Sequence, residues 1–198
     1  YDMCVDIFGA DHMDAYPDVL AALNQLGFND KNVIVLIHQF VSIVKNGETT
    51  KMSTRQGNFT TLDQLINDIG PDVVRYFFIM RHMNSHLNFD LELAKQKSEN
   101  NPVYYIQYAY ARICTIVDKT SDSNNKPDLN QLTENDEIQL IHKLIEFEEL
   151  IIKLKDKSEP QMLANYLFEL ATLFHKYYAN YKIISDDKIL TEARLKLI

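Results

Sequence analysis

The stretch NPVYYIQYAYARICTIV (residues 101–117) carries two different rows of side chains on one predicted helix. An apolar stripe repeats at intervals of three and four residues, the spacing that places side chains on one helix face. A second stripe has the same spacing and lies roughly 145° away from the first, at ~100° per residue. The pattern predicts a helix that packs with its apolar stripe and turns the other stripe away from the core. The apolar stripe consists of Val103, Ile106, Tyr110, Ile113 and Val117, and the tyrosine–arginine stripe of Tyr105, Tyr108 and Arg112.

The tyrosine–arginine stripe is suited to contact with unpaired RNA bases. Tyrosine rings provide stacking surfaces, and an arginine adds a cation for phosphate or for further stacking. The alternative is that a neighbouring helix covers this face, so that the tyrosines belong to the core. On a later helix, His175, Lys176 and Tyr178 could also reach RNA, but we do not count them among the predicted RNA-binding residues.

Helical patterns dominate the chain beyond about residue 91, around a polar loop at 119–131. The expected helices span residues 91–98, 101–118, 134–155 and 159–183. Two further rows of apolar residues predict packing seams, and Ser158 with Gln161 predicts a capping box. The first seam contains Leu140, Leu144, Phe147, Ile151 and Leu154, and the second contains Leu163, Leu167, Leu170, Phe174, Tyr177 and Tyr181.

The first part of the chain alternates strand and helix signals. We expect a buried strand at 5–9, a helix at 13–26, and one bent strand or two short strands at 32–44. Asn46-Gly47 is a hairpin signal. This β-α-β alternation predicts part of a parallel α/β sheet. A capping box from Thr61 to Gln64 then begins a helix at 62–69, followed by a helix at 71–83 and an extended segment at 85–90.

The chain is therefore predicted to be α+β and mainly α, in three segments: 1–50, 51–96 and 97–198. Its 198 residues carry a net charge of −8, so a globally basic surface is absent and any contact with nucleic acid must be local. No apolar run approaches the ~20 residues of a membrane span. With two cysteines and no signal peptide, we expect a cytoplasmic protein with no membrane or DNA partner.

The stretch KMSTR (51–55) suggests binding of an oxyanion. Lys51 and Arg55 are cations, the Ser53 hydroxyl can donate a hydrogen bond, and Gly57 lets the backbone approach a phosphate closely. A solvated basic turn is the alternative.

Asp11 and His12 follow the first predicted strand, at the edge where ligands of parallel sheets bind. There they could hydrogen-bond a ribose, an adenine edge or an amino group, or serve merely as a helix cap and a surface histidine. A metal site is not expected, because no third ligand has suitable spacing.

KMSTR resembles the KMSKS loop of class I aminoacyl-tRNA synthetases, with Thr54 where that motif has its second lysine. Its flanks occur in the order typical of bacterial arginyl-tRNA synthetases, and the resemblance covers essentially the whole chain. The quoted stretches are GADHMDAY (9–16), GPDVVRYFFIMR (70–81), SHLNFDLELA (85–94) and NPVYYIQYAYARI (101–113).

The resemblance implies the C-terminal part of a Rossmann-type catalytic domain (1–50), a KMSKS-type loop with a stem-contact joint (51–96) and a helical anticodon-binding bundle (97–198). It implies an arginine–tRNA ligase that uses ATP with Mg²⁺, L-arginine and tRNA(Arg), as a monomer. Lys51 and Ser53 would be catalytic. The same resemblance places ATP or the adenylate at Asp11, His12, Lys51, Met52, Ser53 and Arg55, and tRNA at Arg75, Tyr105, Tyr108 and Arg112.

None of the histidines lies in the H-x-G-H string that class I enzymes carry. The start without methionine and the end inside a helical pattern also suggest a piece of a longer chain, so we expect no adenylation by this piece alone. Two other functions stay open. One is a non-catalytic tRNA-binding module, and the other is a helical protein-interaction module.

Overall fold

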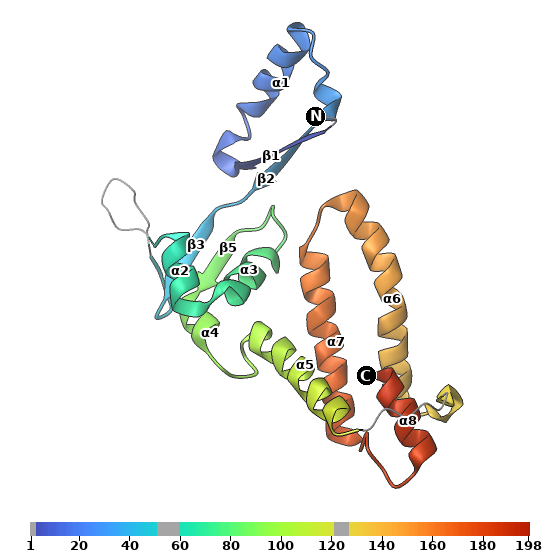
Figure 1. Cartoon of the computed structure of the whole chain (residues 1–198). Helices are drawn as coiled ribbons and strands as arrows, with labels where there is room; N and C mark the ends of the chain where they lie inside the picture. Colours follow the sequence, from blue (N-terminus) through green and yellow to red (C-terminus); the bar gives the residue numbers. More distant parts are fainter. Residues whose placement is uncertain (1–2, 51–59, 121–126) are drawn as a thin grey trace. The chain divides into compact units, whose positions relative to one another are not determined.

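The computed structural model describes residues 3–50, 60–120 and 127–198 (Figure 1). The chain divides into two compact units, Tyr1–Ala94 and Lys95–Ile198. The fold is mainly helical with two small sheets, which confirms the predicted class. The finer division into three segments stays a prediction.

A parallel pair of strands begins the first unit. The strands are joined through a 3-10 turn, a helix and a second 3-10 turn, which is the β-α-β arrangement expected from the sequence. Their register runs from Cys4 opposite Val33 to Gly9 opposite His38. In chain order the elements are β1 (Cys4–Gly9), η1 (Ala10–His12), α1 (Tyr16–Gln25), η2 (Asp30–Asn32) and β2 (Val33–His38).

Strand β1 is not buried, contrary to expectation. Val5 is 46% and Ile7 is 69% exposed, because a sheet of two strands covers little of either face. Helix α1 ends at Gln25 and is closed by Gly27, as its sequence predicts, with φ of +84° at the glycine. The Gly27 amide donates to Asn24 and the Phe28 amide to Leu23, each at 3.0 Å, which is the Schellman pattern of hydrogen bonds.

The predicted segment 32–44 is two strands in two different sheets. After β2 the chain leaves the first sheet at Gln39, whose amide donates to the Met83 carbonyl at 2.8 Å. The second sheet has the order β4-β3-β5. Strand β3 pairs antiparallel with β4 through Asn46 and Gly47, which both have positive φ as a type I′ hairpin requires, and it pairs parallel with β5. The strands are β3 (Val41–Lys45), β4 (Glu48–Thr50) and β5 (Leu87–Asp90).

Three helices complete the first unit, and α2 has the predicted capping box. The Thr61 hydroxyl oxygen accepts from the Gln64 amide at 3.1 Å, and the Gln64 side chain accepts from the Thr61 amide at 3.0 Å. The next helix ends at Ile79 rather than at 83, and a turn follows in which the Ser85 amide donates to the His82 carbonyl at 2.8 Å. The helices are α2 (Leu62–Ile69), α3 (Pro71–Ile79) and α4 (Leu91–Lys95), and the core beneath them contains Ile43, Leu65, Val74, Phe77, Leu87 and Phe89.

The second unit is helical (Figure 1). One buried cluster joins its helices through residues from α5, α6 and α7. In the described part of the chain, no helix combines the length and the apolar character needed to cross a bilayer. The elements are α5 (Pro102–Asp118), η4 (Leu129–Gln131), α6 (Asn135–Lys157), α7 (Gln161–Asn180) and α8 (Lys188–Leu197), and the cluster is Ala109, Ile116, Leu140, Ala171, Phe174, Tyr177 and Ile183.

Two local predictions for these helices are wrong. Ser158 does not cap α7, because it has left-handed geometry at the end of α6, where its amide donates to Leu154 at 3.2 Å. Pro160 precedes α7 without a side-chain cap. The predicted α6 seam is only partly buried: Leu140 is 4% exposed, whereas Leu144 is 42% and Ile151 is 45% exposed.

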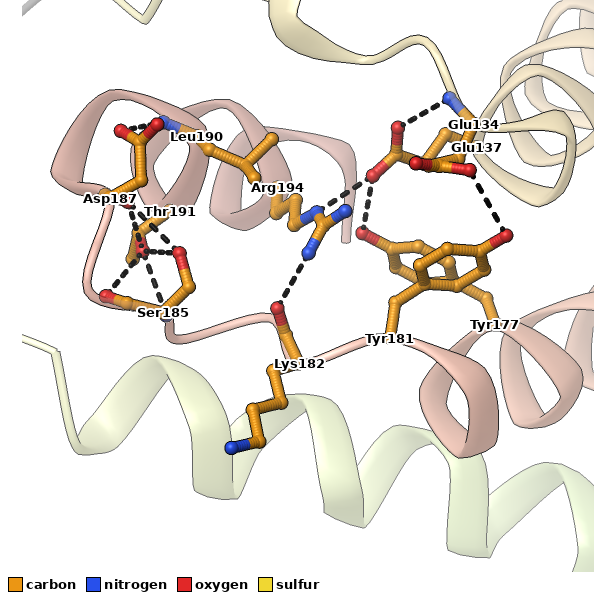
Figure 2. Close-up of polar contacts among 10 residues, drawn as sticks. All are labelled: Glu134, Glu137, Tyr177, Tyr181, Lys182, Ser185, Asp187, Leu190, Thr191 and Arg194. Atoms are coloured by element: carbon orange, nitrogen blue, oxygen red, sulfur yellow. Dashed lines mark hydrogen bonds and ion pairs between the residues drawn. The ribbon is translucent and has the colours of Figure 1, made fainter.

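Polar contacts join α8 to α6 and to Lys182, which follows α7 in the chain (Figure 2). The Glu137 carboxylate accepts three hydrogen bonds, from Nε of Arg194 at 2.7 Å, the Tyr177 hydroxyl at 3.2 Å and the Glu134 amide at 3.0 Å. Nη1 of Arg194 donates to the Lys182 carbonyl at 2.7 Å. The Arg194–Glu137 ion pair thus lies at the centre of a network that links the end of α7 to the start of α6.

Candidate nucleic-acid interface

Helix α7 packs on α5 along a line between the two stripes of α5. Ala109 and Ile116 are the most buried residues of this contact on α5, and Ala171 lies opposite on α7. The small side chains of Ala109 and Ala171 let the two helices approach closely. The apolar stripe is therefore buried only in part: Val103 is 6% exposed, and Ile106 and Ile113 pack against the buried cluster. Tyr110 is 70% and Val117 is 49% exposed.

The middle of the apolar stripe also faces a groove. Ile106, Tyr110 and Ile113 line one side of an apolar hollow of about 400 Å³. Leu167 and Phe174 of α7 line the other side. The periodicity of α5 therefore correctly predicts an apolar surface on this helix, but α7 covers only one edge of that surface.

The tyrosine–arginine stripe divides between the core and the surface. Tyr105 is covered by α7: its ring centroid lies 4.3 Å from that of His175 and 5.5 Å from that of Phe168. The prediction that Tyr105 faces away from the core is wrong, because α7 crosses this side of α5. Tyr108 stays 39% exposed, and Arg112 is half-buried beside it.

Arg112 lies between two aromatic rings. Its Cζ atom is 4.2 Å from the centroid of Tyr108 and 4.7 Å from that of Tyr178. Its Nη2 donates to the Tyr108 hydroxyl at 2.9 Å, and its Nη1 lies 3.3 Å from Nδ1 of His175. Tyr104 continues the surface, since its ring is stacked on Tyr108 with centroids 6.0 Å apart. We call these five residues the Arg112 cluster.

Lys176 of α7 does not add a second cation beside Arg112, because its ammonium group is paired with a carboxylate of α6. Nζ of Lys176 contacts Asp136 of α6 at 2.7 Å, so Lys176 does not belong to the cluster. The hydrogen bonds from Lys176 and then from Asn180 hold the pKa of Asp136 below its usual value.

The Arg112 cluster combines partly exposed aromatic rings with a guanidinium group. Such surfaces stack unpaired bases and bind phosphate. Sequence reasoning left Tyr104, His175 and Tyr178 unassigned. The spacing of three residues between His175 and Tyr178 was a usable signal, because it places both on one face of α7.

A second candidate site lies in the first unit, at the end of β1. Asp11 and His12 form η1 there, with Nε2 of His12 3.7 Å from Oδ2 of Asp11 and both side chains more than half exposed. His38 ends the neighbouring strand, opposite Gly9. A side chain at Gly9 would collide with the Asp11 carboxylate. The strand end therefore presents an exposed acid and an exposed imidazole, as the sequence predicts.

The remaining predicted residues are divided between described and undescribed parts of the chain. Lys51, Met52, Ser53 and Arg55 lie outside the described residues. Arg75 is exposed on α3 and lines a pocket of about 320 Å³ with apolar residues of α2 and α3. Within the described residues, no group of three or more His, Cys, Asp or Glu is arranged to hold a metal ion.

Comparison with known protein families gives a match within the second unit. Residues 106–198 match the DALR anticodon binding domain family. Over its whole length the chain is 47% identical to an arginine–tRNA ligase of Salinibacter ruber and 47% identical to that of Chlorobium limicola. It spans 36% and 37% of the length of these relatives.

Solved structures agree with this relation. A crystal structure from Campylobacter jejuni, named as an arginyl-tRNA synthetase, matches all of this chain over 44% of its own, with a TM-score of 0.86 and 32% identity. The Thermus thermophilus arginyl-tRNA synthetase shares the fold, with a TM-score of 0.76 at 20% identity over 99% of this chain and 37% of its own. Over its whole length the chain is therefore similar to part of the arginyl-tRNA synthetases, and its residues 106–198 match the DALR anticodon binding domain family.

Proposed function

We propose that this chain is the part of an arginine–tRNA ligase that binds the anticodon arm of tRNA(Arg) and carries the KMSKS-type ATP loop. The complete enzyme joins L-arginine to ATP, which forms arginyl-adenylate and releases pyrophosphate. The arginyl group then passes to the terminal ribose of the tRNA, and AMP leaves.

The single observation that carries the RNA-binding role is the position of Arg112 between the rings of Tyr108 and Tyr178. The net charge of −8 gives the protein no broad attraction for RNA. Stacking on exposed rings supplies affinity without such a field, at ~1–3 kcal/mol for each stacked base. A local aromatic and cationic surface is thus the kind of RNA site that an acidic protein can use.

In the adenylation step, Lys51 and Ser53 are proposed to stabilise the negative charge that develops on the leaving pyrophosphate. An ammonium group and a hydroxyl donor aimed at phosphate oxygens act mostly through electrostatics. Asp11 and His12 are proposed to hold the nucleotide at the sheet edge, where both side chains are exposed. Arg75 is proposed to contact the tRNA stem, and Met52 and Arg55 to complete the loop around ATP.

ATP is a substrate here, and we expect Mg²⁺ to arrive with its phosphates. We also infer a cytoplasmic location and a monomeric state, in line with the sequence analysis.

A binding experiment tests the RNA role directly. Fluorescence anisotropy with a labelled arginine tRNA, at two stated salt concentrations, should give saturable binding to the 198-residue chain. An unlabelled anticodon stem–loop of the same tRNA should compete, and an acceptor-stem hairpin should compete less. Absence of binding at low salt would contradict the RNA role and favour a protein-interaction module.

A second experiment separates the ligase from a non-catalytic tRNA-binding module. The chain is combined with the complementary remainder of a related arginine–tRNA ligase, and arginylation of tRNA is measured. We expect activity that Lys51→Ala abolishes while tRNA binding persists. Binding without any arginylation in the wild-type combination would favour the non-catalytic module.

A further inference from the structure

His175 bridges α7 and α5 through both of its ring nitrogens. Nδ1 lies 3.3 Å from Nη1 of Arg112, and Nε2 lies 3.0 Å from the carbonyl oxygen of Tyr105. The ring also packs on the aromatic rings of Tyr105 and Tyr108, at centroid distances of 4.3 and 5.8 Å. One side chain of α7 thus contacts three residues of the tyrosine–arginine stripe.

These two contacts define which nitrogen carries the proton. A guanidinium group has only donors, so Nδ1 of His175 must accept from Arg112. A backbone carbonyl only accepts, so Nε2 must donate to Tyr105. Both bonds together require neutral His175 with its proton on Nε2. A protonated imidazole has no acceptor for Arg112.

The bond from His175 constrains Arg112 in a way that Tyr108 cannot. Tyr108 lies one turn before Arg112 on the same helix, so their hydrogen bond leaves both free to move with α5. His175 comes from α7 and supplies a directional bond across the helix pair. The guanidinium is then held from two sides, by the Tyr108 hydroxyl on Nη2 and by His175 on Nη1.

We propose that His175 is a positioning residue for RNA binding: it holds Arg112 in place between Tyr108 and Tyr178. This inference rests on the proposed function of the Arg112 cluster. With two of its five N–H groups engaged by Tyr108 and His175, the guanidinium offers the others in a fixed direction to a phosphate or a base edge. Holding the side chain before binding removes part of the entropy lost when RNA binds.

The test compares two substitutions of His175 by anisotropy with the labelled arginine tRNA. His175→Phe keeps an aromatic ring but removes both hydrogen bonds, and should weaken binding about 2- to 10-fold. His175→Gln keeps one acceptor and one donor, and should restore binding to within about twofold of wild type. Failure of the glutamine variant to restore binding, with unfolding midpoints equal to that of the phenylalanine variant, would overturn the proposal.

A double-mutant cycle with Arg112 distinguishes positioning from a structural effect. In an Arg112→Ala background, His175→Phe should cause no further loss of tRNA affinity. An equal loss in both backgrounds would mean that His175 acts without Arg112, and would overturn the proposal. Imidazole ¹⁵N chemical shifts of the free protein should report a proton on Nε2, and a proton on Nδ1 would also overturn it.

These outcomes distinguish a failure of the proposed RNA-binding function from a failure of the proposed role of His175. Wild-type protein that binds no tRNA would remove the proposed function and, with it, the role of His175. Wild-type binding that His175→Phe leaves unchanged would remove only the role of His175.

Discussion

Nε of Arg194 on α8 lies 2.7 Å from Oε1 of Glu137 on α6, and both residues are almost completely buried, at 6% and 0% exposure. The pair joins two helices through residues that are 57 positions apart in the chain. The Glu137 carboxylate also accepts from the Tyr177 hydroxyl and the Glu134 amide, and Arg194 also donates to the Lys182 carbonyl. A buried ion pair of this kind is tolerated because each charge has hydrogen-bonding partners besides the other.

Arg194→Met should destabilise the second unit strongly, since it leaves the Glu137 carboxylate buried without its counter-charge. We expect a loss of about 3–5 kcal/mol in the free energy of unfolding, measured by urea denaturation with circular dichroism. As the matched control, Lys153→Met removes the exposed pair with Glu149 and should cost at most about 1 kcal/mol. Equal losses in the two variants would contradict the structural role of the buried pair.

The Asp136 carboxylate should make stability depend on acid pH. Its pKa is held below its usual value by hydrogen bonds from Lys176 and Asn180, so the folded state binds its proton less tightly than the unfolded chain. The resulting stabilisation is fully present above the unfolded pKa of about 4 and is lost as pH falls through the lower, folded value.

Urea unfolding at a series of pH values therefore checks this carboxylate. The stability advantage of wild type over Asp136→Asn should be present at neutral pH and should shrink below about pH 4. In a Lys176→Met background the advantage should already be smaller at neutral pH, because the main cause of the lowered pKa is gone. A difference independent of both pH and Lys176 would show that Asp136 stabilises the fold in another way.

Tyr108→Ala should weaken binding of arginine tRNA. The substitution removes a partly exposed ring that contacts Arg112 and Tyr104, so a stacked base loses its platform. We expect the Kd to rise about 5- to 150-fold, the equivalent of ~1–3 kcal/mol. Tyr110→Ala is the matched control, because Tyr110 is on the same helix but faces the apolar groove. Similar effects of the two substitutions would argue against a site centred on the Arg112 cluster.

Thr61→Ala should weaken the start of α2, which follows the stretch that resembles the KMSKS loop. The Thr61 hydroxyl accepts the Gln64 amide, and its loss leaves a helix-end donor without this partner. We expect a cost of about 0.5–2 kcal/mol in chemical denaturation. Thr60→Ala removes the same groups one residue earlier, outside the capping box, and should cost less. The reverse order would be incompatible with the capping geometry.

Local signals in the sequence were sufficient for most elements. The Thr61 capping box, the Asn46-Gly47 hairpin and the Gly27 helix end depend on residues within one turn of each other, so they could be predicted without the rest of the chain. The Ser158 capping box failed because α6 continues up to Ser158, which then adopts the left-handed geometry of a helix end. Ser158 lies between the end of α6 and the start of α7, and the sequence pattern did not show which of the two helices it would cap.

The helical repeat of α5, its two stripes and the resemblance to arginyl-tRNA synthetases can all be read from the amino-acid sequence. Tertiary structure alone decided which face of α5 is covered. Because α7 approaches through Ala109 and Ala171, Tyr105 is partly buried and Tyr110 is exposed. It also decided that His175 meets Arg112, 63 residues away in the chain. Periodicity describes one helix at a time, whereas burial depends on where a second helix finds small side chains that let it approach.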